Sequence, residues 1–127
     1  MFSMVISTEF FALLKELSGA LAAGRTEEAE RLDLEVRAAI LPVRGPGARM
    51  EILGVVAQSL KKDGQFKAAL PYFRELCAIG SVHAPSEKNT AYDYRYYAEC
   101  LRATGDDEEA AEWDEMAAMI GLLHGGL

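Results

Sequence analysis

The sequence is poor in the residues that mark secreted or metal-binding proteins. It contains two cysteines, two histidines, four prolines and one tryptophan among 127 residues. Two cysteines are too few for a disulfide framework, and both lie on or beside apolar helical patterns. We therefore expect Cys77 and Cys100 to be small buried hydrophobic residues in a reducing compartment. His83 and His124 have no second histidine or cysteine at ligand spacing, so we expect no metal and no cofactor.

Basic charge and long hydrophobic runs are also scarce. Lysine and arginine number 13 against 20 aspartates and glutamates, which gives a formal net charge of −7. Because a nucleic-acid binder needs a basic surface, we expect no nucleic-acid partner. No apolar run approaches the roughly 18 residues of a membrane span, so we expect no membrane insertion. The N-terminal MFSMVISTEFFALL lacks a basic start and contains Glu9, which indicates the beginning of a core helix rather than a signal peptide. We expect a cytoplasmic protein.

Alternating apolar and polar residues, the pattern of strands, are missing as well. Apolar residues recur instead at helical spacing, as Leu53, Val56 and Leu60 do. The pattern predicts an all-α single domain over residues 1–127, with helical hairpins at about 9–40, 49–79 and 90–123. Connectors are expected at PVRGPG (42–47) and GSVHAPSEKN (80–89). Thr26 is expected to cap the second helix, and Thr90 with Asp93 resembles a capping box for the fifth.

The predicted hairpins share an internal repeat. Each has a glycine at its turn and an alanine five residues later; these pairs are Gly24 and Ala29, Gly64 and Ala69, and Gly105 and Ala110. The apolar positions before the second turn recur 41 residues later, so that Ala57 corresponds to Ala98. Self-similarity at such a period predicts a stacked solenoid. We expect the small residues to lie where paired helices approach most closely.

This pattern resembles the tetratricopeptide repeat family. GQFKAALPYFREL (64–76) and GDDEEAAEWDEMA (105–117) are similar to the second half of its repeat unit, and the resemblance covers about residues 10 to 123. It implies three stacked hairpins in a right-handed superhelix, with a non-catalytic role in protein–protein interaction as a scaffold, adaptor or co-chaperone. The turn glycines are spaced by 40 and 41 residues, longer than the roughly 34 of that family, so a HEAT-like helical repeat is the alternative.

In that family the first helix of each pair lines a concave groove. Helical register places the following residues on its exposed side: Lys15, Gln58, Lys61, Lys62, Tyr92, Arg95, Glu99 and Arg102. Five of them are basic, which favours a groove for an acidic peptide or a C-terminal carboxylate. The alternative is that lysines and arginines simply make exposed helices soluble. Tyr92 and Tyr96 are expected to be partly exposed, as interface anchors or as packing residues.

The end of the chain suggests a second role. The last repeat of a solenoid exposes an apolar face unless a further helix covers it, and no residues for such a helix follow Leu123. Met116, Met119, Ile120 and Leu123 are therefore candidates for a face that joins two copies in a homodimer. The alternative is that the sixth helix folds this side inward. No nucleophile motif or phosphate-binding loop is present, and we expect no enzyme.

Overall fold

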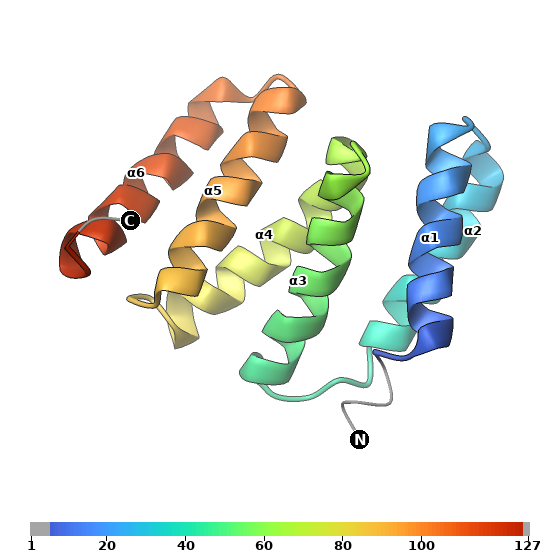
Figure 1. Ribbon diagram of the computed structural model, residues 1–127, viewed down its shortest axis with the longest axis horizontal. Helices are drawn as coiled ribbons and strands as arrows, with labels where there is room; N and C mark the ends of the chain where they lie inside the picture. The colour runs from blue at the N-terminus through green and yellow to red at the C-terminus, as the bar shows by residue number, and fades with distance from the viewer. Residues whose placement is uncertain (1–5, 126–127) are drawn as a thin grey trace.

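The computed structural model describes residues 6–125 and confirms the all-α prediction. This part of the chain contains no strand and six helices: α1 (Thr8–Ala22), α2 (Thr26–Ile40), α3 (Pro46–Lys62), α4 (Phe66–His83), α5 (Lys88–Ala103) and α6 (Asp107–Leu123). Consecutive helices pair as antiparallel hairpins, α1 with α2, α3 with α4 and α5 with α6 (Figure 1). Among the described residues, no helix combines the length and the hydropathy that crossing a bilayer requires.

The three hairpin turns are built in the same way. Gly24, Gly64 and Gly105 have φ angles of 73°, 77° and 93°, a left-handed conformation that suits glycine. The backbone N–H after each glycine donates to the carbonyl oxygen five residues earlier. These bonds run from Arg25 to Ala20 (2.9 Å), from Gln65 to Leu60 (2.8 Å) and from Asp106 to Leu101 (2.8 Å). This is the Schellman pattern, which satisfies carbonyls at the helix end. The repeated glycines of the sequence therefore mark repeated structure.

The helix beginnings follow the sequence less closely. Ser7 caps α1 by accepting a hydrogen bond of 3.1 Å from the Phe10 N–H. The prediction that Thr26 caps α2 is wrong, because Thr26 is the first helical residue and Arg25 occupies the cap position without a side-chain bond. The Schellman turn leaves only Arg25 between Gly24 and the helix, so Thr26 falls within the first turn.

The predicted connector at residues 80–89 is largely helical. Helix α4 continues through Gly80 to His83, and the connector comprises residues 84–87. A Cβ atom on Gly80 would lie 3.2 Å from Thr90 Cγ2 and 3.3 Å from Met50 Cε, so the missing side chain allows close packing there. The helix stops before Pro85, because a residue that precedes proline disfavours the helical conformation.

The start of α5 also differs from the prediction. Thr90 and Asp93 do not form a capping box, since α5 begins at Lys88 with Glu87 as its N-cap. Thr90 is buried instead, and its hydroxyl has no hydrogen-bond partner within residues 6–125. Asp93 lies on the side of α5 that faces α3. Helix α3 begins at Pro46, three residues before the predicted position 49, and proline suits the first helical position.

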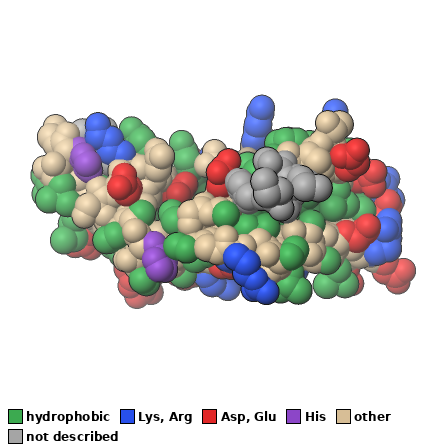
Figure 2. All heavy atoms as spheres, turned by 90° about the horizontal axis from the view of Figure 1, so that it is seen from below, with side chains coloured by type: hydrophobic (Ala, Val, Ile, Leu, Met, Phe, Trp, Pro, Cys, Tyr) green, Lys and Arg blue, Asp and Glu red, His purple; other side chains and the backbone are tan. Residues whose placement is uncertain are grey.

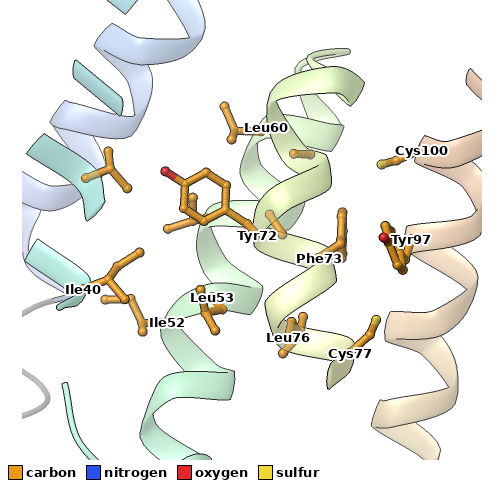
Figure 3. Close-up of a cluster of buried hydrophobic side chains, with 14 of the residues drawn as sticks. Ile40, Ile52, Leu53, Leu60, Tyr72, Phe73, Leu76, Cys77, Tyr97 and Cys100 are labelled. Carbon is orange, nitrogen blue, oxygen red and sulfur yellow. The ribbon is translucent and has the colours of Figure 1, made fainter. Parts of the chain in front are cut away.

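One hydrophobic core runs through all three hairpins. Figure 3 shows it continuing from Ile40 of α2, past Leu53 and Leu76, to Tyr97 of α5. Ala57, Ala69, Ala98 and Ala110 are fully buried, as the close-approach prediction requires, and Ser18 is buried at the matching place in α1. Cys77 and Cys100 are also buried and free. Burial raises the pKa of the Cys100 thiol to about 11 and raises the pKa of Cys77 as well.

Aromatic side chains join the second hairpin to the third. The ring of Phe73 on α4 stacks with Tyr97 on α5 at a centroid distance of 6.4 Å. The ring centroid of Trp113 on α6 lies 4.9 Å from that of Tyr94 and 5.3 Å from that of Tyr97. Glu109 accepts hydrogen bonds from the Trp113 ring N–H at 3.1 Å and from the Tyr97 hydroxyl at 3.2 Å. These contacts hold α5 and α6 in a fixed position beside α4.

Candidate binding groove

Two adjoining pockets lie between α3 and α5. The larger, here called the Asp93 pocket, has a volume of about 530 Å³ and is lined by Met50, Glu51, Gly54, Val55, Gln58, Asn89, Tyr92, Asp93 and Tyr96. The second, the Lys62 pocket, has a volume of about 490 Å³ and is lined by Val55, Gln58, Ser59, Lys61, Lys62 and Tyr96. Because the two share Val55, Gln58 and Tyr96, they form one continuous surface, the α3–α5 groove.

Helical spacing places these residues on facing sides of the two helices. On α3, Glu51, Gln58 and Lys62 follow one another at intervals of seven and four residues, and on α5 Asn89 precedes Tyr96 by seven. Such intervals keep side chains on one side of a helix. Gly54 lies midway along the α3 wall, where an added Cβ would meet only Leu76 Cδ2, at 3.9 Å. The missing side chain therefore leaves space in the groove.

An ion pair crosses the groove at the Lys62 pocket. The Nζ atom of Lys61 on α3 lies 2.7 Å from Oε2 of Glu99 on α5. The same Nζ atom lies 5.0 Å from the ring centroid of Tyr96, within the range of a cation–π contact. The positive charge of Lys61 is therefore compensated within the protein, and Lys62 is the exposed cation on this side.

Two carboxylates line the Asp93 pocket, one from each helix. Asp93 of α5 is half-buried, and Glu51 of α3 is exposed. Neither forms an ion pair with another side chain in residues 6–125. Burial raises the pKa of Asp93 from its ordinary value of 3.8 to about 6. This end of the groove is thus acidic, with a negative charge that lacks a cationic neighbour.

The structure brings together some of the predicted groove residues and separates others. Gln58, Lys61, Lys62 and Tyr92 line the groove, and Glu99 reaches across it to Lys61. Arg102 instead pairs with Asp114 of α6. Lys15 on α1 is exposed and Arg95 is half-buried, and both lie outside the lining residues. Of the five basic residues, Lys61 and Lys62 therefore line the groove, Lys61 and Arg102 are paired with carboxylates of the protein, and the acidic partner stays a prediction.

Sequence reasoning missed Asp93 as a groove residue. Its place three residues after Thr90 suggested a helix cap, whereas its helical spacing relative to Asn89 and Tyr96 indicates a groove residue. Asn89, Asp93 and Tyr96 follow one another at intervals of four and three residues and share a side of α5 with Tyr92. The sequence did contain a signal for these residues: Asn89 and Tyr96 lie one helical turn before and after Tyr92, which was predicted to line the groove.

Two acidic residues of α2 pair with arginines of the same helix. Salt bridges join Arg31 to Glu35 at 2.8 Å and Arg37 to Asp33 at 2.7 Å. In the view of Figure 2, charged side chains of both signs gather at the end of the molecule that the first hairpin forms. The exposed pair of Arg31 and Glu35 contributes little to stability and makes this surface soluble.

A separate apolar cleft lies between the first and second hairpins. It has a volume of about 260 Å³, and its walls include Leu17 and Leu21 of α1, Ala29 of α2, and Ala68 and Pro71 of α4. The charged pair of Asp33 and Arg37 lies at its edge. Asp33 also accepts a hydrogen bond from the Tyr72 hydroxyl of α4. The contact between the first and second hairpins thus combines an open apolar cleft with a hydrogen bond and with an ion pair at the edge of the cleft. The contact between α4 and α5, by contrast, is packed with aromatic rings.

The predicted oligomer face is exposed in three of its four residues. Met116, Met119 and Leu123 are 38%, 62% and 70% exposed, but Ile120 is 6% exposed. The expectation that Ile120 is uncovered is therefore wrong. It lies one helical turn from Met116 and from Leu123, which flank it, and all four residues line a shallow apolar groove of about 360 Å³ beside Pro85 and Tyr94.

The described residues contain no group of three or more histidine, cysteine, aspartate or glutamate side chains placed to hold a metal ion. Comparison of the chain with models of protein families, with curated proteins and with solved structures finds no match.

Proposed function

We propose that this chain is a tetratricopeptide-like helical-repeat protein whose α3–α5 groove binds a segment of a partner protein. Three hairpins with the same glycine turn and the same buried alanine support the repeat assignment. Under this proposal they stack as a right-handed superhelix, and the protein acts in the cytoplasm as a non-catalytic scaffold, adaptor or co-chaperone. The first helix of each of two successive hairpins supplies the groove, which is where such repeats present a binding surface.

The observation that carries this proposal is the chemistry of the groove walls. Tyr92 is 39% exposed and Tyr96 is half-buried, so both rings offer apolar area together with a hydroxyl. Gln58 and Asn89 add amide groups that can bond to a partner's backbone. Partly exposed tyrosines surrounded by polar side chains are typical of binding hot spots. The groove is more suited to a polypeptide than to a small molecule, because it is open and elongated.

The size of the groove supports a short segment. Along the α3 wall Lys62 lies 11 positions after Glu51, which corresponds to about 16 Å at 1.5 Å per helical residue. An extended chain covers that distance with about five residues. A partner segment of this length, with side chains alternating toward and away from the groove, would contact both pockets.

Selection of binding peptides from a random display library tests the proposal. We expect selected peptides to shift the amide NMR signals of residues 50–62 and 89–99 and to bind Tyr92→Ala about tenfold more weakly. Phe11→Ala is the matched control, because Phe11 is 50% exposed on α1 and lies outside the groove. The proposal fails if selected peptides bind both variants equally and shift signals elsewhere.

A second candidate function is self-association through α6. The observation that favours it is the apolar groove around Ile120, whose rim residues Met119 and Leu123 are both more than half exposed. Pairing with a second copy would cover these side chains. This role is compatible with segment binding, since the α6 groove and the α3–α5 groove share no lining residue.

A further inference from the structure

We propose that the Asp93 pocket accepts a cationic side chain, lysine or arginine, of the bound partner segment. The inference rests on the proposed function and specifies which segments the groove selects. It reverses the charge preference that the sequence suggested, because the structure distributes charge along the groove differently from the predicted line of basic residues.

The first step concerns the charges within the pocket. Glu51 of α3 and Asp93 of α5 face the same cavity from opposite walls, and neither is paired with a cation among the described residues. Asp93 lies near Cys77 of α4 and Tyr94 of its own helix, both neutral at pH 7. The part of the chain that the structure describes contributes no lysine or arginine to the pocket lining. A partner's cation would therefore supply the missing compensation.

The second step is that α5 already binds a lysine side chain of the protein itself. In the adjoining pocket, Lys61 places its ammonium group against the Tyr96 ring and beside the Glu99 carboxylate. An aromatic ring and a carboxylate on one side of α5 thus already hold one lysine. Earlier on the same helix, Tyr92 and Asp93 offer the same two kinds of group at adjacent positions, and Tyr96 borders both pockets. The Asp93 pocket thus contains the kinds of group that hold Lys61, in a different spacing, and no cation from the protein's own residues 6–125 occupies it.

The third step concerns size and lining. A volume of about 530 Å³ is sufficient for a lysine or arginine side chain with part of its backbone. Met50 and Val55 provide apolar contact for the aliphatic stem of such a side chain. The side-chain carbonyls of Asn89 and Gln58 provide further acceptors for an ammonium or guanidinium group. The burial that raises the pKa of Asp93 also strengthens its attraction for a cation, because water screens a half-buried charge less.

The test uses two small probes that differ in charge. N-acetyl-lysinamide and its uncharged analogue N-acetyl-norleucinamide are titrated into the isotope-labelled full chain at pH 7.5, with NMR detection. We expect the lysine probe to shift the signals of residues 50–55 and 89–96 and to bind at least five times more tightly than the norleucine probe. Asp93→Asn should remove that preference, and Glu51→Gln should reduce it. Thermal unfolding of each variant establishes that it is folded.

Several results would overturn the inference. These are equal shifts from the two probes, shifts that lie outside the pocket, and a lysine preference that survives in both Asp93→Asn and Glu51→Gln. The experiment separates this inference from the proposed function. If library peptides occupy the groove without basic residues and the lysine probe does not bind, segment binding stands and the cation preference fails. If no peptide occupies the groove but the lysine probe does, the pocket chemistry stands and segment binding fails.

Discussion

The Tyr72 hydroxyl of α4 donates a hydrogen bond to the Asp33 carboxylate of α2, and this bond joins the second hairpin to the first. Arg37 completes the arrangement, since its guanidinium lies 5.0 Å from the centroid of the Tyr72 ring and 2.7 Å from Asp33. Burial raises the pKa of Tyr72, so its hydroxyl stays protonated and remains a donor at any physiological pH. The bond lies next to the apolar cleft, where the two hairpins leave space between them.

We expect Tyr72→Phe to lower the free energy of unfolding by about 1–2 kcal/mol, because a half-buried carboxylate loses a donor while the ring packing is kept. Urea denaturation measures the change. Hydrogen exchange should show the largest increase in α2, since the first hairpin is the element that the bond secures. Tyr92→Phe is the matched control, as its hydroxyl is exposed and bonds to no described residue. Equal effects of the two changes would contradict this role for Asp33.

Asp93 makes the stability of the chain depend on pH. Burial raises its pKa to about 6, above the 3.8 of an ordinary aspartate, so the unfolded chain loses this proton first as pH rises. The contribution of Asp93 to the free energy of unfolding is therefore fully present below pH 4, where the carboxyl is protonated in both states. It is lost as pH rises through 6, because the folded state must then hold a charged carboxylate in a partly buried place. A shift of about two units corresponds to roughly 3 kcal/mol, which we reduce to about 1–2 kcal/mol because the carboxylate is partly exposed.

Asp93→Asn should therefore stabilise the protein by about 1–2 kcal/mol at pH 7.5 and by almost nothing at pH 4. Urea denaturation at several pH values between 4 and 8 measures the difference. Glu51→Gln, at an exposed position of the same pocket, is the control for the loss of a negative charge there. A constant difference between Asp93→Asn and the wild type across this range would exclude ionisation of Asp93 as the cause. A residue that lowers stability but lines a pocket is typical of a binding site, where function outweighs the loss of stability.

The sequence was sufficient to predict the features that local chemistry determines. Left-handed turns require glycine, so Gly24, Gly64 and Gly105 marked the hairpins correctly. Helical spacing identified buried residues such as Leu53 and Leu60. Both signals act within a few residues of the chain, and sequence patterns report them directly.

Features that depend on packing between distant elements could not be predicted in this way. Gly80 suggested a helix end, but it lies inside α4, where Thr90 of α5 is close to it. Arg102 was placed in the groove by register, but Asp114 of α6 holds it elsewhere. The pairing of Lys61 with Glu99 required knowledge of how α3 and α5 are offset along their axes. The charge of the groove, and hence its expected partner, depended on these contacts.

The close approach of α4 and α5 at Gly80 leads to a third prediction. Replacing glycine by alanine inside a helix normally stabilises it by about 1 kcal/mol. We expect that gain for Gly54→Ala, whose new Cβ would meet only Leu76 Cδ2, at 3.9 Å. Gly80→Ala should lose the gain, because its Cβ would lie 3.2 Å from Thr90 Cγ2 and 3.3 Å from Met50 Cε. Thermal unfolding should place Gly80→Ala at least about 1 kcal/mol below Gly54→Ala.

A double mutant identifies the source of this penalty. Thr90→Ser removes the Cγ2 atom that lies nearest to the new Cβ, so Gly80→Ala should cost less in the Thr90→Ser background than in the wild type. The difference between the two costs measures the contact between the two positions. If the cost of Gly80→Ala is the same in both backgrounds, crowding against Thr90 is not its cause.

The last prediction concerns the apolar groove of α6. Met119 and Leu123 are 62% and 70% exposed, and pairing with a second copy would remove this apolar surface from water. We expect light scattering to show a dimer for the wild-type chain at concentrations of tens of micromolar and a folded monomer for Met119→Glu with Leu123→Glu. Leu34→Glu is the control, because Leu34 on α2 is 66% exposed and distant from this groove. A dimer that persists in the double variant would place the interface elsewhere, and a monomeric wild type would remove self-association as a function. In either case the α3–α5 groove shares no residue with the changed positions, so segment binding should be the same in all three proteins.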